Sequence, residues 1–186
     1  MSVTAIIESH ERAGRYFDVA GVRGFVREAG SGAPVLCLHG VPASSFLYRK
    51  VITELADRGL RALAIDLPGL GLSDRPVHFD YSWTGLGRFC VGAVDALGLE
   101  RFHLVVHDVG GPVGFELARA MPERIVSLTV LNTVVDVDVF RRPWQMKPFA
   151  APLLGELWLA MMQPITVRSL FYHAGIKDRS SMTRDE

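Results

Sequence analysis

The sequence has few cysteines, no excess of either charge and no long hydrophobic run, and each of these features excludes a class of protein. Only 2 of the 186 residues are cysteine, which is too few for a disulfide framework. We therefore expect Cys37 and Cys90 to be reduced, buried thiols. With 20 basic and 20 acidic side chains the formal net charge is zero, so charge gives no reason to expect binding to nucleic acid or to an anionic membrane surface.

No segment has the pattern of an export signal or a membrane span. Residues 1–8 contain neither a basic start nor an apolar run. The most apolar later stretch, Phe149–Met162, is short and is interrupted by Gly155 and Glu156, so we do not expect it to cross a bilayer. Hydrophobic residues make up 49% and charged residues 22% of the chain, which excludes a disordered protein. We predict a soluble, cytoplasmic globular protein.

Strand and helix patterns alternate along residues 15–131. Two short alternating runs, Arg15–Val19 and Val22–Arg27, predict a hairpin that turns at Ala20–Gly21. Continuous apolar runs, typical of strands buried on both faces, follow at Pro34–Leu38, Leu60–Ile65, Phe102–His107 and Ile125–Leu131. Helices are predicted between them, from Ser44 or Ser45 to Gly59 with Leu47, Val51, Ile52 and Leu55 on its apolar face, at Trp83–Leu97 and at Gly110–Ala120.

This alternation predicts an α/β fold with a mostly parallel sheet and helices on both of its faces. Ligands of such sheets bind beyond the carboxyl ends of the strands. Three segments with functional side chains follow those ends: His39–Pro42, Asp66–Asp74 and His107–Gly111. The character of the chain changes after Asn132, and Asp136–Glu186 is rich in proline, methionine and aromatic residues and contains no convincing strand. We therefore predict a core at residues 1–132 and an incomplete helical lid segment at residues 133–186.

Asp108 stands where a buried strand turns directly into a helix. Such a turn strains the backbone of its central residue and requires small neighbours, and Gly110 and Gly111 meet that need. The N-terminus of the following helix favours an ionised carboxylate, which is the form that a nucleophile requires. The alternative is that Asp108 only caps the helix, since aspartate is a preferred cap residue.

The two other loops contribute in different ways. In His39–Pro42 the backbone N–H of Val41 can point into the same space as the N–H of Val109, and two such donors would stabilise an oxyanion or a leaving group. The glycine-rich loop Asp66–Asp74 fits neither a dinucleotide fingerprint nor a Walker P-loop. We interpret it as a structural turn that shapes the site.

These three segments, in this order and spacing, resemble the α/β-hydrolase fold over about Val22 to Leu131. Most members carry serine within Gly-x-Ser-x-Gly, whereas Val106–Gly110 has Asp108 in the serine position. An aspartate there resembles the branch of haloalkane dehalogenases and epoxide hydrolases. The resemblance implies that Asp108 attacks an electrophilic carbon and forms an ester, which a histidine-activated water then hydrolyses. It implies no metal and no cofactor.

The chain departs from that pattern at several positions. Dehalogenases of this branch typically bind halide with an asparagine at the position of Val41 and a tryptophan at the position of Val109, and neither valine side chain can donate a hydrogen bond. One dehalogenase group carries its orienting acid where this chain has Asn132. The segment Leu131–Thr133 is more similar to epoxide hydrolases, whose lid tyrosines protonate the opening epoxide, and Tyr172 is the tyrosine of the lid segment.

The base of this family follows two further strands, and the sequence ends before them. None of the six histidines matches that position. His39 and His107 are local to the two motif loops and are expected to be structural, and His103 lies within a strand. His10 and His78 fall in segments expected to be exposed, and His173 lies in the lid segment. We therefore expect the chain to be a fragment in which neither the base nor the acid that orients it is evident.

The sequence thus predicts a hydrolase whose substrate is a small apolar epoxide or alkyl halide. The candidate substrate-binding residues are His39, Gly40, Pro42, His107, Trp144 and Tyr172. A hydrolase of other ester or carbon–carbon substrates is a second hypothesis, although Ser44 and Ser45 lie in the wrong loop to replace the missing serine. A non-catalytic binding protein or remnant is the third. A homodimer stays open, because the apolar lid residues can pack on the core or on a second copy.

Overall fold

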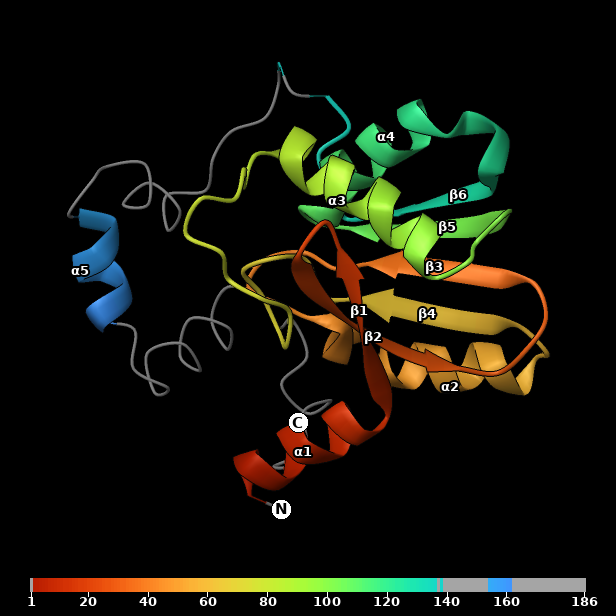
Figure 1. The fold of residues 1–186 in the computed structure, drawn as a ribbon, viewed down its shortest axis with the longest axis horizontal. Helices are drawn as coiled ribbons and strands as arrows, with labels where there is room; N and C mark the ends of the chain where they lie inside the picture. Colours follow the sequence, from red (N-terminus) through yellow and green to blue (C-terminus); the bar gives the residue numbers. More distant parts are fainter. Residues whose placement is uncertain (1, 137, 139–153, 162–186) are drawn as a thin grey trace. The chain divides into compact units, whose positions relative to one another are not determined.

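The computed structural model describes residues 2–136, 138 and 154–161 of the chain (Figure 1). The chain divides into two compact units, Ser2–Val137 and a second unit formed by Met1 with Asp138–Glu186. Helix α5 (Leu154–Met161) belongs to the second unit. Most of residues 133–186 lies outside the described part, so the division into a core and a helical lid stays a prediction.

The first unit is built on one mixed sheet of six strands in the order β1-β2-β4-β3-β5-β6. The strands are β1 (Gly14–Val19), β2 (Val22–Ala29), β3 (Pro34–Leu38), β4 (Arg61–Ile65), β5 (Phe102–His107) and β6 (Ile125–Leu131). Strands β3 to β6 run parallel, and β2 joins the sheet antiparallel to both β1 and β4. The predicted class, a mostly parallel α/β sheet that begins with a hairpin, is confirmed.

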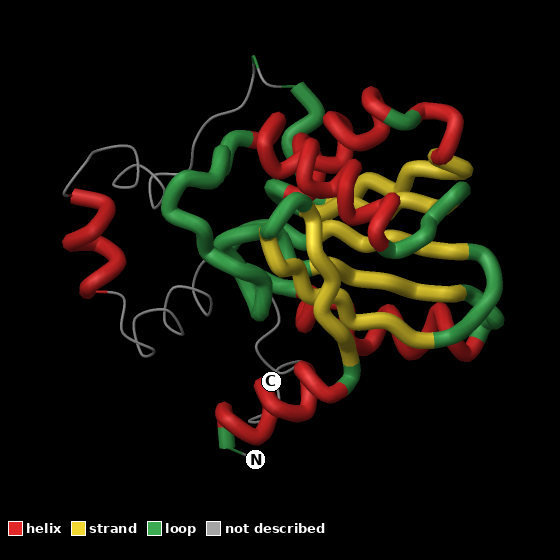
Figure 2. The backbone as a smooth tube through the Cα atoms, in the orientation of Figure 1, coloured by secondary structure: helices red, strands yellow, loops and turns green. Residues whose placement is uncertain are grey.

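Helices cover both faces of this sheet, as the sequence predicts. Figures 1 and 2 show α3 (Trp83–Ala96) and α4 (Gly110–Ala120) on one face and α2 (Arg49–Asp57) on the other. Strand β3 serves both layers, because Leu36 and Leu38 pack on the α3–α4 side while Val35 and Cys37 pack with α2. This double burial explains the continuous apolar run of β3.

Both cysteines are free and buried, as expected from the sequence. Burial raises the pKa of the Cys37 thiol and of the Cys90 thiol to about 12. The two thiols therefore stay protonated at neutral pH and behave as small apolar side chains of the core.

The strand order creates a topological switch point beside β3. The chain passes from β3 through α2 to its neighbour β4, and then through α3 to β5 on the opposite side of β3. The loops that follow β3 and β5 consequently diverge from the same edge of the sheet, where parallel α/β folds bind their ligands.

The N-terminal segment differs from its prediction. Residues Val3–Arg12 form helix α1, which Ser2 caps by accepting a hydrogen bond from the backbone N–H of Ala5. The expected exposure of His10 is wrong, because only 5% of this residue is exposed. Its ring packs on Phe25, with centroids 5.3 Å apart, and its Nε2 lies 3.0 Å from Ser45 Oγ. Contacts with residues distant in the sequence cause this burial, so local pattern could not reveal it.

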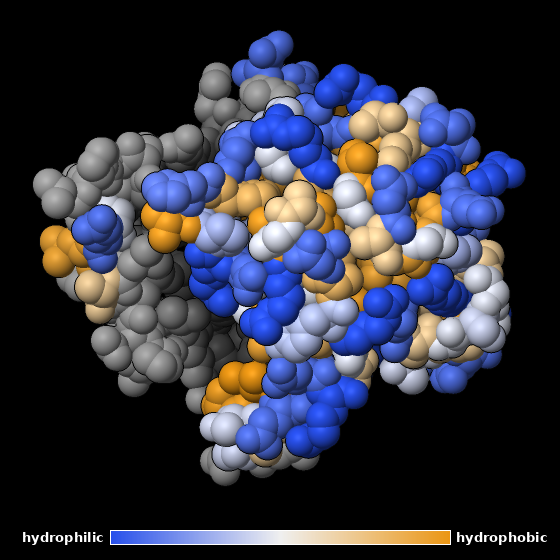
Figure 3. Space-filling model, viewed as in Figure 1, coloured by the Kyte–Doolittle hydropathy of each residue, from blue (hydrophilic) through white to orange (hydrophobic). Residues whose placement is uncertain are grey.

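Among the described helices, none is both long and apolar enough to cross a membrane. On the face of the first unit shown in Figure 3, hydrophilic side chains dominate and apolar ones are scattered between them. Strand β6 forms one edge of the sheet, and its exposed apolar side chains are Val126, Leu128, Val130 and Leu131.

The predicted apolar face of the helix after β3 is only partly correct. Ile52 is 1% exposed and packs under β3 and β4, but Leu47 and Val51 are each 43% exposed. The reason is that residues 45–48 form a separate 3₁₀ turn, so α2 begins at Arg49 and its apolar stripe is narrower than predicted.

The two adjacent residues of α2 provide a matched test of this register. We expect Ile52→Ala to lower the free energy of unfolding by about 2–5 kcal/mol, because it leaves a cavity in the core. Val51→Ala should change it by less than about 0.5–1 kcal/mol, since this side chain is largely exposed. Urea denaturation of both variants measures the difference, and similar losses in the two would show that the assigned face of α2 is incorrect.

Candidate active site

Asp108 occupies the turn between β5 and α4 in a strained backbone conformation. Its φ is 53°, in the left-handed region that few residues other than glycine adopt. The Gly111 N–H donates to the Asp108 carbonyl at 2.9 Å, and the Thr133 hydroxyl donates to the same carbonyl. A Cβ at Gly110 would overlap the backbone carbonyl of Leu38, so β3 can approach the turn this closely only because position 110 is glycine. The strained turn predicted from the sequence is confirmed.

The loop after β3 reaches across to the Asp108 side chain. The backbone N–H of Val41 donates to Oδ1 of Asp108 at 2.8 Å. Gly40 is buried beneath this contact, where a Cβ would overlap the Asp108 carboxyl group. The structure thus brings together the two loops that the sequence singled out.

The helix-cap interpretation of Asp108 is not what the structure contains. Val109 is the N-cap residue of α4, with no side-chain cap hydrogen bond, and the Asp108 carboxylate binds Val41 instead. Among the described residues, Oδ2 of Asp108 accepts no hydrogen bond and no histidine hydrogen-bonds to this carboxylate. The carboxylate is therefore held at one oxygen, on a turn that presents it beyond the strand ends.

His39 has a structural position. It is completely buried, its Nδ1 lies 2.8 Å from the Gly40 carbonyl oxygen, and its Nε2 lies 3.1 Å from the Leu67 backbone N. Because the Leu67 N–H can only donate, Nε2 accepts, and the proton must lie on Nδ1, which donates to Gly40. Burial lowers the pKa of His39 below 6.5, in favour of this neutral form. The prediction that His39 contacts the substrate is wrong, because none of its side chain is exposed.

The glycine-rich loop after β4 is a structural turn, as interpreted from the sequence. The buried Asp66 carboxylate accepts the Ser45 backbone N–H at 2.6 Å on Oδ1 and the Leu72 backbone N–H at 2.7 Å on Oδ2. The first bond ties the loop after β4 to the start of the segment that leads into α2, and the second closes the loop on itself.

The remaining candidate residues are placed as follows. His107 precedes Asp108 on β5, is half-buried, and its buried Nδ1 has no hydrogen-bond partner among the described residues. Pro42 is exposed and joined to Val41 by a cis peptide bond. Substrate contacts of Gly40, Pro42 and His107 stay predictions. Trp144 and Tyr172 lie outside the described residues.

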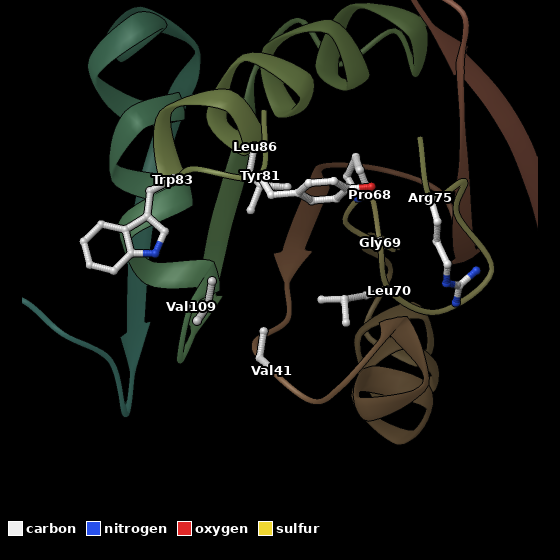
Figure 4. A pocket seen from close by; sticks show the side chains of 9 residues that line it. All are labelled: Val41, Pro68, Gly69, Leu70, Arg75, Tyr81, Trp83, Leu86 and Val109. Atoms are coloured by element: carbon white, nitrogen blue, oxygen red, sulfur yellow. The ribbon is translucent and has the colours of Figure 1, made fainter. Parts of the chain in front are cut away.

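An open, mainly apolar pocket of about 470 Å³ adjoins the two loops. Figure 4 shows the residues that line it: Val41, Pro68, Gly69, Leu70, Arg75, Tyr81, Trp83, Leu86 and Val109. Val41, whose N–H binds the Asp108 carboxylate, and Val109, which follows Asp108 in the sequence, both line this pocket, so the carboxylate lies at its edge. No sequence motif identified Tyr81, Trp83 or Leu86 as pocket residues. The available signal was two large aromatic residues, Tyr81 and Trp83, near the start of a predicted helix.

Comparison with known proteins identifies related sequences. The model of the alpha/beta hydrolase fold family matches residues 33–169. An uncharacterized hydrolase of Saccharomyces cerevisiae is 39% identical over 114 residues, which cover 60% of this chain and 39% of the yeast protein. Haloalkane dehalogenase 2 of Mycobacterium bovis is 39% identical over 119 residues, which cover 64% of this chain and 41% of the dehalogenase. The chain thus spans about two-fifths of the length of these relatives.

Solved structures agree with the sequence comparison. Epoxide hydrolase VrEH1 from Vigna radiata is 36% identical with a TM-score of 0.61, and the match covers 63% of this chain and 37% of the plant protein. Haloalkane dehalogenase DatA from Agrobacterium tumefaciens C58 is 29% identical with a TM-score of 0.70, and the match covers 87% of this chain and 54% of the dehalogenase.

The buried histidines predict a pH dependence of stability. Burial is the main cause that lowers the pKa of both His10 and His39 from 6.5. The unfolded chain therefore binds more protons than the folded chain below about pH 6.5, so stability falls as the pH is lowered through that value. We expect a slope of up to about 1.4 kcal/mol per pH unit for each histidine.

Urea denaturation at a series of pH values between about 7.5 and 5.5 measures this slope. His39→Asn and His10→Asn should each remove one contribution and flatten the dependence. A slope that is unchanged in both variants would show that carboxylates rather than these histidines cause it.

Proposed function

The chain belongs to the alpha/beta hydrolase fold family, and from that premise we propose that Asp108 is the nucleophile of a hydrolase acting on small apolar epoxides or alkyl halides. One observation carries the proposal. A carboxylate on a left-handed residue, not used as a helix cap, is bound at one oxygen by the Val41 N–H at the edge of an apolar pocket. The relation to haloalkane dehalogenases and epoxide hydrolases supports an aspartate in this role.

The first chemical step uses the oxygen that Val41 does not bind. With Oδ1 held by the Val41 N–H, Oδ2 attacks the electrophilic carbon and forms a carbon–oxygen bond. In an alkyl halide the carbon–halogen bond breaks and halide leaves with the electron pair. In an epoxide the ring carbon–oxygen bond breaks, and the alkoxide takes up a proton to give a hydroxyl group. Both routes leave an ester on Asp108.

The second step is hydrolysis of that ester. Water adds to the ester carbonyl carbon, and the negative charge that develops on the carbonyl oxygen, Oδ1, is stabilised by the Val41 N–H. The bond between the carbonyl carbon and Oδ2 then breaks, and the alkyl group leaves with Oδ2 as an alcohol after protonation. This step regenerates the Asp108 carboxylate. The water requires a base, and no described histidine hydrogen-bonds to Asp108, so the identity of the base stays a prediction from the family.

The two valines beside the carboxylate favour an epoxide over a halide. Val41 and Val109 flank the carboxylate with apolar side chains, which offer a halide no hydrogen bond beyond those of the backbone. An alternative serine mechanism has no support, because Ser45 is completely buried and its histidine partner is not a base toward it. Arg27 donates to His10 Nδ1, so His10 Nε2 carries the proton and donates to Ser45 Oγ. The cytoplasmic location and a homodimer stay predictions from the sequence.

Covalent trapping tests the proposal directly. Incubation with a panel of apolar epoxides and primary alkyl halides should add to the protein the whole mass of an epoxide, or the mass of an alkyl halide less hydrogen halide. Intact mass spectrometry detects the adduct, and peptide mapping should locate it on Asp108.

Two substitutions control for unspecific alkylation. Asp108→Asn should abolish the adduct, whereas Glu100→Gln, which removes an exposed carboxylate elsewhere, should leave it unchanged. An adduct that persists in Asp108→Asn, or the absence of any adduct across the panel, would refute Asp108 as the nucleophile and favour a non-catalytic binding protein.

A further inference from the structure

One peptide unit connects the buried His39 to the carboxylate of Asp108. The carbonyl oxygen of Gly40 accepts a hydrogen bond from His39 Nδ1 at 2.8 Å. The N–H of the same peptide unit, which belongs to Val41, donates to Asp108 Oδ1 at 2.8 Å. The carbonyl and the N–H of a trans peptide point in opposite directions within one plane, so the orientation of one fixes that of the other.

We infer that His39 is a positioning residue that aims the Val41 N–H at the Asp108 carboxylate by holding the Gly40 carbonyl on the opposite side of the peptide. Gly40 needs such a support because glycine has the least restricted backbone of any residue. The Gly40 carbonyl also accepts the Ala43 N–H at 3.1 Å, but that donor belongs to the same loop, whereas His39 joins the peptide to the segment after β4. Without the His39 donor, the Gly40–Val41 peptide can rotate and withdraw the N–H from Oδ1.

The imidazole is itself fixed at both nitrogens. Its Nε2 accepts the Leu67 N–H at 3.1 Å at the end of β4, and the side chain is completely buried. The opposite tautomer would place a lone pair against the Gly40 carbonyl and a proton against the Leu67 N–H, so only the Nδ1–H tautomer satisfies both contacts. The neighbouring strand thereby fixes the donor direction of His39.

This arrangement matters for the reaction, and here the inference rests on the proposed function. The Val41 N–H selects Oδ2 as the attacking oxygen and later stabilises the oxyanion on Oδ1. Loss of a single oxyanion donor typically slows an enzyme by about 10²–10³-fold. His39 does not touch the substrate and acts only through the Gly40–Val41 peptide.

Two amide substitutions separate the two nitrogens of His39. In His39→Asn the side-chain amide takes the place of Nδ1 and can still donate to the Gly40 carbonyl, but the acceptor for Leu67 is lost. In His39→Gln the amide oxygen takes the place of Nε2 and can still accept from Leu67, but the side-chain donor to Gly40 is lost and the Ala43 N–H is the donor that remains. Tyr48→Phe is the structural control, since it removes a buried hydrogen bond to the Leu38 carbonyl without touching the Gly40 peptide.

Hydrogen exchange of the Val41 amide is the first measurement, because it needs no substrate. We expect His39→Gln to accelerate this exchange by about tenfold or more, and His39→Asn and Tyr48→Phe by less than about threefold. The rate of adduct formation on Asp108 is the second, and it should fall by about tenfold or more in His39→Gln only.

The outcomes distinguish this inference from the proposed function. Loss of Val41 protection in His39→Gln supports the positioning role even if wild type forms no adduct, in which case the proposed function alone fails. Unchanged Val41 exchange in His39→Gln overturns the positioning role, and faster exchange with an unchanged adduct rate overturns its link to the reaction. If His39→Gln does not fold, loss of Val41 protection in His39→Asn but not in Tyr48→Phe would overturn the inference.

Discussion

The candidate site depends on the hydrogen bond between the Val41 N–H and the Asp108 carboxylate. This 2.8 Å contact joins two loops separated by 67 residues in the sequence. It can form only because β3 and β5 are adjacent parallel strands, so that the loops after them leave the sheet side by side. After β3 the chain adds β4 on one side of β3 and β5 on the other side. This change of side is the topological switch point, and the contact lies there.

The surrounding residues can be understood as conditions for that contact. The left-handed backbone of Asp108 raises its side chain above the strand end, and the carbonyl hydrogen bonds from Gly111 and Thr133 maintain this strained conformation. Gly40 leaves room for the carboxyl group where any Cβ would overlap it. His39, bound to the end of β4, then orients the peptide that carries the donor. The strained backbone of Asp108, the absence of a Cβ at Gly40 and the buried imidazole of His39 thus all support the hydrogen bond between the Val41 N–H and Asp108.

The sequence predicted those parts of the molecule that depend on local pattern. The apolar run of β3, the hairpin turn at Ala20–Gly21 and the strained turn at Asp108 each have their signal within a few adjacent residues, and the structure confirms them. The burial of His10 and the position of Trp83 in the pocket lining arise from contacts between distant segments, which no local pattern encodes. His39 shows the same limit, since its motif allowed both a structural role and a substrate contact, and only the fold shows that its ring is completely buried.

The position of the carboxylate supports the proposed chemical role of Asp108 over a purely structural one. A helix-capping aspartate directs its oxygens at the first N–H groups of its own helix and has no need of a left-handed backbone. Here Asp108 has a left-handed backbone, and the N-cap residue is Val109, whose side chain cannot accept a hydrogen bond. Strain of this kind costs about 1–3 kcal/mol and persists where the surrounding contacts impose it. An aspartate used only for stability would gain more from the cap, so the geometry favours a carboxylate kept available to the pocket.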